Sequence, residues 1–392
     1  MSQLSSDIVS VFCDLLGEPA GLHEPCFQGR EWDYVKDCID TGWVSTAGSY
    51  VGRFEEMLGD FTDTSHVIAT SSGTAALHAI FAGLDIGDSD EVIVPALTFV
   101  ATANAVTYTG AVPHFADAEA TSLGIDAEKL RVHLTEIATT RDGRLINQKT
   151  GRRIAAVVCM HTFGHPSDLD ALTKLCDDFG IDLIEDAAES LGSYYKGRHT
   201  GNQGRVATLS FNGNKTITTG GGGAIMTNDD ALAKRLRHLT TTAKQPHKWE
   251  FIHDEVGYNY RLPNINAALG CAQLEVLPEF LIQKRQLADA YDHAFSRLDG
   301  VTFFKEPSWG QSNYWLNLLM LDASDSTLRD EVLEATNASG FMTRAAWRPM
   351  HQLSMFMECP RMDLSVTEDT YTRLINIPSS SQLATRLVNA TA

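Results

Sequence analysis

The chain has 392 residues, of which 43% are hydrophobic and 21% are charged, and its formal net charge is −19. This length allows one large and one small domain, and the composition is that of a folded protein and not of a disordered one. The negative charge argues against partners such as nucleic acid or an anionic membrane surface. The amino terminus lacks the basic region of a signal peptide, no apolar run is long enough to cross a bilayer, and the seven cysteines form no CxxC pair. We therefore expect a cytoplasmic protein.

Short apolar runs alternate with helical patterns from residue 66 onward. Five of these runs predict strands, at residues 66–70, 91–95, 111–117, 154–160 and 181–186. After the first run, Leu77, Ile80 and Leu84 follow the spacing of an amphipathic helix. This alternation predicts an α/β fold in which a mainly parallel sheet of about seven strands is connected by crossover helices.

The carboxyl-terminal third begins with a long helical pattern and continues as a smaller α/β unit. Strands are expected near 301–304 and 314–320, and a helix near 326–338. We therefore predict an amino-terminal segment and large domain over 1–260, and a linking helix and small domain over 261–392.

One local stretch, residues 140–153, is basic in an otherwise acidic chain and carries turn signals. The favoured interpretation is a solvated hairpin, and the alternative is an element that screens a diphosphate.

The stretch SFNGNKTITTGGGG, from Ser210 to Gly223, raises the question of what its lysine does. A nucleotide-triphosphate loop needs GxxxxGK[ST], but Asn214 precedes Lys215 and the glycines follow it. A dinucleotide fold needs GxGxxG, but Ile225 stands where the last glycine would be. A third chemistry, a Schiff-base lysine for pyridoxal 5'-phosphate, predicts further parts that can be sought elsewhere in the chain.

The sequence supplies each of those parts. Asp186 ends an apolar strand, where its carboxylate could pair with the pyridinium nitrogen. Gly73 and Thr74 open a helix directly after a strand, which provides N–H groups for a phosphate. Phe99 follows another strand and could cover the ring, and Ser210 could add a hydroxyl to the phosphate. Each residue alone has an ordinary interpretation as a cap, a core residue or a turn, so the prediction depends on their joint appearance.

At this point the chain resembles a known family, the DegT/DnrJ/EryC1/StrS sugar aminotransferases, which have the fold-type I pyridoxal phosphate architecture. The matching motifs cover nearly the whole chain: GWVSTAGSYVGRFE (42–55), SSGTAALHA (71–79), PALTFVATANAV (95–106), HTFGHPSDLD (161–170), IEDAAESLG (184–192), SFNGNKTITTGGGGAI (210–225), GYNYRLPNINAALGCAQLE (257–275) and RAAWRPMHQL (344–353).

The resemblance implies pyridoxal 5'-phosphate as cofactor, with pyridoxamine 5'-phosphate as its intermediate form. Lys215 would bind the cofactor covalently and later move the proton, and Asp186 would hold the pyridinium nitrogen. Asn259 would reach the phosphate of the partner subunit in a homodimer with shared sites. The implied cofactor-binding residues are Ser72, Gly73, Thr74, Phe99, Asp186, Glu189, Ser210, Asn212, Lys215 and Asn259.

Two positions depart from the usual family pattern. Glu189 stands near the expected ring hydroxyl, where the family more usually has Gln or His, and Gly221 replaces the glutamate of a GEGG tract. The second departure, Gly221, together with GLHEPCFQGREW (21–32), HTFGHP and the basic hairpin, is similar to the pattern of a subgroup that aminates nucleotide-linked 4-keto-6-deoxy-N-acetylhexosamines in bacillosamine- and legionaminic-type pathways.

The leading hypothesis is therefore a transaminase that converts such a sugar, linked to UDP, into the 4-amino sugar with glutamate as donor. Alternatives are amination at a 3-keto position, a sugar dehydratase, and a regulatory protein on the same fold. The dehydratases replace the lysine with histidine, so Lys215 counts against that alternative. No metal is expected. The candidate substrate-binding residues are Trp43, Ser45, Gly48, His247, Lys248, Arg344 and His351.

Overall fold

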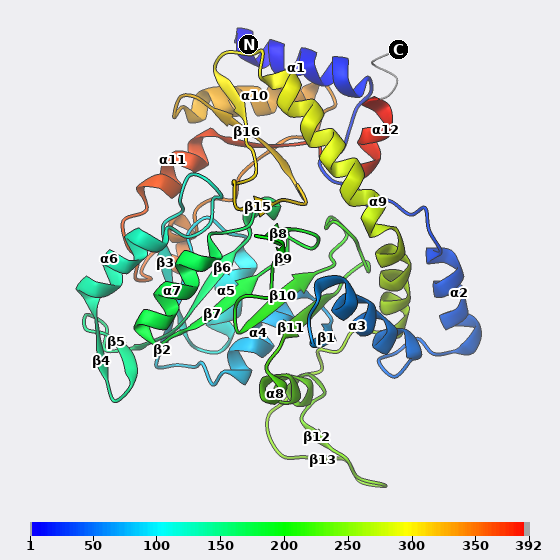
Figure 1. Cartoon of the computed structure of the whole chain (residues 1–392), viewed down its shortest axis with the longest axis vertical. Coiled ribbons are helices and arrows are strands. Elements are labelled where there is room, and N and C mark those ends of the chain that lie inside the picture. Colours follow the sequence, from blue (N-terminus) through cyan, green and yellow to red (C-terminus); the bar gives the residue numbers. More distant parts are fainter. Residues whose placement is uncertain (1, 388–392) are drawn as a thin grey trace.

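A computed structural model describes residues 2–387 and is built around one large sheet (Figure 1). Seven of its strands follow the order β1-β11-β10-β7-β6-β2-β3, and the β4–β5 hairpin joins through β5 to β6. All neighbours on the path from β10 to β3 are parallel, whereas β11 runs antiparallel to both β1 and β10. The strands are β1 (His66–Thr70), β2 (Asp90–Pro95), β3 (Val112–Ala116), β4 (Ala138–Arg141), β5 (Arg144–Asn147), β6 (Arg153–Met160), β7 (Asp182–Asp186), β10 (Val206–Ser210) and β11 (Gly223–Thr227). The predicted mainly parallel α/β sheet is confirmed.

Two apolar cores form against this sheet. One contains residues of α4 (Gly73–Gly83), α5 (Val100–Tyr108), α6 (Ala127–Ile137) and α7 (Leu169–Phe179) together with β2, β6 and β7. The other packs α3 (Ser49–Thr62) and the first half of α9 (Asn264–Phe295) against β1, β10 and β11. Every residue of β2 is buried, which explains why residues 92–95 are a continuous apolar run and not an alternating pattern.

A second, four-stranded antiparallel sheet lies at the other end of the molecule. Its order is β14-β16-β18-β17, formed by β14 (Val301–Phe303), β16 (Asn317–Leu321), β18 (Leu374–Ile377) and β17 (Arg344–Ala345). This sheet shares a third core with α1 (Gln3–Leu16), α10 (Ser326–Ala338) and the second half of α9, and α11 (Ser365–Arg373) and α12 (Ala384–Leu387) complete this part. Helix α1 thus packs with the carboxyl-terminal unit, although it lies in the segment that the sequence grouped with the large domain. The division at residue 260 stays a prediction.

Helix α9 connects the two parts of the molecule, as the yellow-green helix in Figure 1 shows. It is 32 residues long and contains Pro278. By length and composition it would suffice to cross a membrane, but half of its most apolar stretch is buried within the molecule. Its apolar residues pack into the two cores just described, so the structure uses it as a core helix.

The remaining elements are short or peripheral. The β12–β13 hairpin projects away from the body below α8 (Figure 1), and its tip exposes Trp249 and Phe251 at 77% and 80% of their surfaces. These elements are α2 (Glu31–Thr41), α8 (Asp230–Thr240), β8 (Tyr194–Tyr195), β9 (Arg198–His199), β12 (Lys244–Gln245), β13 (Ile252–His253), β15 (Gly310–Gln311) and 3-10 turns at Thr162–Gly164, Met350–Gln352, Ser354–Phe356 and Ser381–Leu383.

Most predicted elements are present at the predicted positions. The five strands, the helix after the first strand, the long helix past residue 263 and the helix near 326–338 are all confirmed. The basic stretch forms the β4–β5 hairpin, as its favoured interpretation requires. The strand predicted to begin at 314 begins at Asn317. The side chains of Ser312 and Asn313 accept hydrogen bonds from the N–H groups two residues later, at positions 314 and 315, and so hold this segment in a turn.

Candidate active site

A cavity of about 290 Å³ lies where the carboxyl ends of β1, β2, β7 and β10 meet. These four strands run in the same direction, so the segments that follow them gather at one edge of the sheet. The cavity brings together nine of the residues expected to bind the cofactor: Ser72, Gly73, Thr74, Phe99, Asp186, Glu189, Ser210, Asn212 and Lys215.

Asp186 forms part of the cavity wall at the end of β7, with 3% of its surface exposed. One carboxylate oxygen accepts a hydrogen bond of 2.8 Å from the Thr102 hydroxyl, and the other accepts one of 3.2 Å from the Ala188 N–H. Burial raises the pKa of the Asp186 carboxyl, and these hydrogen bonds offset part of that effect. Within residues 2–387, no cation lies within ion-pair distance of this carboxyl, and the Lys215 ammonium acts on it only from a longer distance, where its charge also lowers the pKa.

Lys215 follows β10, and its side chain enters the same cavity. Its Nζ atom lies 3.2 Å from Oε1 of Glu189 and 3.9 Å from the centre of the Trp315 ring. Two hydrogen bonds hold the loop that carries Lys215. The Lys215 N–H donates to the Asn212 carbonyl within the loop, and the Trp315 indole donates to the Asn214 carbonyl from outside it. The ammonium group is therefore held in place by a carboxylate and an aromatic face.

The amino terminus of α4 forms another part of the cavity wall. Ser72 caps this helix by accepting a hydrogen bond from the Ala75 N–H, and Gly73 is its first residue. The first N–H groups of a helix have no partner within the helix, which makes this end suited to a phosphate. Gly223 has to be glycine, because a Cβ atom there would lie 2.4 Å from the Ser72 carbonyl carbon.

Glu189 is buried, with 2% of its surface exposed. Its Oε2 atom accepts a hydrogen bond of 2.9 Å from the Phe163 N–H, while Oε1 faces Lys215. Burial raises the pKa of the Glu189 carboxyl to about 7 even though Lys215 opposes the shift. The residue that departs from the usual family pattern is thus in contact with Lys215.

The residues of the cavity fit pyridoxal 5'-phosphate. A buried carboxyl without a cation suits a pyridinium nitrogen, a helix amino terminus with Ser72, Thr74 and Ser210 suits a phosphate, and Lys215 provides a primary amine. Phe99 is the residue just before α5. Its side chain is half exposed, so its ring can cover a ligand in the cavity.

The other predicted site residues lie outside this cavity of their own chain. Trp43 and Ser45 lie in the loop before α3, where their carbonyls accept hydrogen bonds from Asn264, and Gly48 lies against the same side chain. His247 and Lys248 are on the projecting β12–β13 hairpin, where Lys248 lies over Trp249. Arg344 is exposed on β17, His351 binds Glu368, and Asn259 forms a bridge with Thr241. Their roles at the site stay predictions.

Several lining residues were not predicted from the sequence. Thr102 follows Phe99 by one helical turn, so a search for partners of Asp186 could have found it. Trp315 and Trp347 come from the carboxyl-terminal part and stack on either side of Phe163, with ring centres 6.5 and 4.5 Å from it. Nothing near Lys215 in the sequence indicates these two rings.

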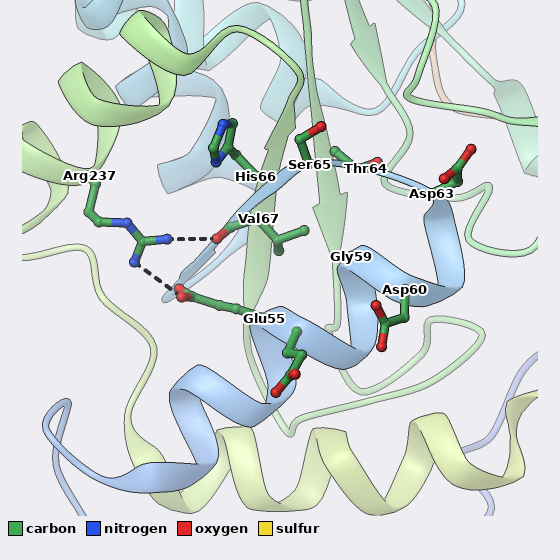
Figure 2. A pocket seen from close by; sticks show the side chains of 10 residues that line it. Glu55, Gly59, Asp60, Asp63, Thr64, Ser65, His66, Val67 and Arg237 are labelled. Atoms are coloured by element: carbon green, nitrogen blue, oxygen red, sulfur yellow. Dashed lines mark hydrogen bonds and ion pairs between the residues drawn. The ribbon is translucent and has the colours of Figure 1, made fainter.

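A larger open hollow, of about 570 Å³, lies elsewhere, next to β1 and α3. Figure 2 shows that Arg237 reaches across it to Glu55 and to the Val67 carbonyl. Glu55 also pairs with Arg261, so its charge is already balanced. At the base of the projecting hairpin, His238, Asp254 and Glu255 lie close enough to share an ion, but Gln245 and Arg235 already bind the two carboxylates. Neither place resembles the lysine site in its chemistry.

The fold and the site define a fold-type I pyridoxal phosphate-dependent aminotransferase. The sequence profile of the DegT/DnrJ/EryC1/StrS aminotransferase family matches residues 25–390. The chain therefore belongs to this family of sugar aminotransferases, and its cofactor is pyridoxal 5'-phosphate.

Individual relatives cover nearly the whole chain. The GDP-perosamine synthase of Escherichia coli O157:H7 is 35% identical over 367 residues, which are 94% of this chain and 95% of that protein. The GDP-perosamine synthase of Caulobacter vibrioides is 36% identical over 360 residues, 92% of each chain. The crystal structure of the aminotransferase TlmJ from Streptoalloteichus hindustanus superposes with a TM-score of 0.83 at 27% identity, covering 95% of this chain and 97% of that one.

Proposed function

We propose that this enzyme aminates the 4-keto group of a nucleotide-linked 4-keto-6-deoxy sugar, with glutamate as the amino donor. The observation that carries the proposal is the placement of Lys215, Asp186 and the amino terminus of α4 around one cavity. The proposed substrate class, a nucleotide-linked sugar, comes from the sugar aminotransferase family to which the chain belongs and from relatives named as GDP-perosamine synthases. Each part of a transamination site is present, which favours an active enzyme over a regulatory protein.

When bound, pyridoxal phosphate supplies a carbonyl for the amino group and a ring that withdraws electrons. Asp186 would keep the ring nitrogen protonated, because a buried carboxylate stabilises a proton on a neighbouring base. Lys215 would carry the proton between the two carbon atoms that exchange it, because it is the one lysine among the described residues that line the cavity. Phe99, Trp315 and Trp347 would exclude water from the reacting atoms, since their rings form the apolar part of the wall.

Two sugars are the leading candidates for the substrate. The resemblance carried by Gly221, GLHEPCFQGREW (21–32), HTFGHP and the basic hairpin favours a UDP-linked 4-keto-6-deoxy-N-acetylhexosamine. The names of two relatives at 35% and 36% identity specify a GDP-linked amino sugar as product, which favours a GDP-linked 4-keto-6-deoxyhexose. Amination at a 3-keto position is a third candidate. A sugar dehydratase is disfavoured, because such enzymes have histidine at the position of Lys215.

The test is a mass-spectrometric screen of purified enzyme with glutamate and a panel of nucleotide-linked keto sugars. The panel contains the GDP- and UDP-linked 4-keto-6-deoxy sugars and one 3-keto sugar, each incubated with ¹⁵N-glutamate. We expect ¹⁵N in the product from one 4-keto sugar and none with Lys215→Ala. Transfer to the 3-keto sugar alone would refute amination at C4, and transfer to none would refute the substrate class.

We also propose a homodimer in which Asn259 completes the partner's site, acting in the cytoplasm. Asn259 does not line the cavity of its own chain, which fits a role across an interface. Lys215→Ala and Asn259→Ala, each inactive alone, are mixed in equal amounts and allowed to exchange subunits. A shared site restores about one quarter of wild-type activity, because half of the dimers are mixed and each has one intact site. No recovery after proven exchange would exclude the shared site.

A further inference from the structure

Glu189 uses its two carboxylate oxygens for different partners. Oε2 is fixed by the Phe163 N–H at 2.9 Å, and Oε1 lies 3.2 Å from the Lys215 ammonium. Phe163 adopts a left-handed backbone conformation, with φ 57° and ψ 14°, which is unfavourable for a residue that is not glycine. This unusual conformation accompanies an N–H that points at Glu189, so the carboxyl group is oriented by backbone and not by a mobile side chain.

The charge on Glu189 depends on a single partner. Among the described residues, Lys215 is the one cation within ion-pair distance of this carboxylate. The other titratable group that acts on it is Asp186, whose negative charge favours a proton on Glu189. A buried carboxylate that loses its only cation is costly, and it avoids that cost by taking up a proton.

We propose that Glu189 is the proton-storing partner of Lys215, taking up a proton whenever the lysine loses its positive charge and returning it when the ammonium is restored. When a lysine ammonium condenses with a carbonyl, two of its hydrogens leave with the carbonyl oxygen as water. The third leaves as a proton, and Oε1 of Glu189 is positioned to receive it. The reverse hydrolysis consumes water and returns the proton to the amine. The net charge of the closed cavity then stays constant through both steps.

The surroundings on the lysine side support the same coupling. The Trp315 ring, 3.9 Å from Nζ, stabilises the charged form of Lys215, so ammonium and carboxylate coexist before reaction. Burial raises the pKa of the Glu189 carboxyl to about 7 while the Lys215 charge opposes this shift, so loss of that charge removes the opposition and favours the protonated carboxyl. This inference rests on Lys215 as the reactive lysine, but it does not depend on which sugar is aminated.

The test is the infrared carbonyl band of a protonated glutamic acid in the full-length, cofactor-free protein. Side-chain ¹³C labelling of glutamate shifts this band and separates it from that of Asp186. In Lys215→Met the band is expected at pH 8, and it is expected to be lost in Lys215→Met combined with Glu189→Gln. In Lys215→Arg, which keeps a cation, the band is expected to be absent at pH 8. Lys215→Gln serves as a second uncharged variant if Lys215→Met does not fold.

A structural role for Glu189 would give a different result. If Glu189 only braced Phe163, its protonation would not respond to the charge at position 215, and the Met and Arg variants would give the same spectrum. That result, or a glutamate band that persists in the double variant, would overturn the inference. Glu368→Gln, which alters an exposed glutamate on His351, should leave the band of Lys215→Met unchanged. Because none of these spectra requires a sugar substrate, failure here is distinguishable from failure of the proposed function.

Discussion

Lys284 allows the cost of burying a positive charge in this protein to be measured directly. It lies within α9 with 1% of its surface exposed, and its ammonium donates to the Ser379 carbonyl at 2.7 Å and the Trp315 carbonyl at 3.2 Å. Its third contact, at 3.1 Å, is Nε2 of His23, and within residues 2–387 no carboxylate pairs with it. Burial lowers the pKa of Lys284 to about 7. We predict that this lysine makes folding stability depend on pH in a defined direction.

The magnitude follows from the difference between the folded and unfolded pKa. An unfolded lysine titrates near ~10.4, and each unit of difference corresponds to about 1.4 kcal/mol. Below pH 7 both states are protonated and the native state bears the full cost of the buried charge. Between pH 7 and ~10 the unfolded chain binds a proton that the native state lacks, so the free energy of unfolding rises with pH. The total rise attributable to Lys284 is about 4 kcal/mol over this window.

The assay is urea unfolding of wild type and Lys284→Met at pH 7, 8, 9 and 10, at one protein concentration. Other groups that titrate in this range are common to both proteins, so the wild-type minus variant difference isolates Lys284. We expect this difference to increase by about 1.4 kcal/mol per pH unit. Lys174→Met, at an exposed lysine, is the control and should show no such trend. A difference that is constant or falls with pH would refute the reasoning.

Three further predictions concern the cavity. Lys215→Ala should abolish transamination while cofactor absorbance still shows binding, and turnover within about tenfold of wild type, or 1.4 kcal/mol, would contradict its role. Asp186→Asn should lose most of the rate with little change in melting temperature. A near-normal kcat would mean that another carboxylate keeps the ring nitrogen protonated. Thr102→Val removes the 2.8 Å hydrogen bond to Asp186. Because hydrogen bonds to charged groups contribute ~1.5–3 kcal/mol, kcat should fall by about tenfold. An unchanged kcat would show that Asp186 does not need this hydrogen bond.

The sequence predicted the cofactor half of the site because topology places those residues. Asp186 and Ser210 are the last residues of β7 and β10, and Ser72 lies just after β1; parallel strands bring their carboxyl ends to the same edge of a sheet. Lys215 could be assigned once those partners were recognised together. Local patterns therefore carried most of the information for this part of the site and for the sheet.

The aromatic wall could not be predicted in the same way. Trp315 and Trp347 reach the cavity only because the carboxyl-terminal unit packs against the large sheet, and no local pattern encodes that contact. The orientation of Glu189 toward Lys215 also involves the left-handed conformation of Phe163, which the sequence does not indicate, because the neighbouring Gly164 is the residue suited to a positive φ. The sugar-side residues lie outside the cavity of their own chain, and no local pattern relates them to Lys215.

The pairing of β1 with β11 has a consequence for synthesis of the chain. Thr70 pairs with Gly223, so the strand that leads into the helix at Gly73 waits for a partner made about 150 residues later. At about 5–20 residues per second, this interval is on the order of ten to thirty seconds on the ribosome. During that time both edges of β1 lack their sheet partner, because among the described strands of this sheet β11 is the one that pairs with it. The nascent chain can acquire its cofactor only after β11 inserts between β1 and β10, which makes that insertion the step that a chaperone would have to protect.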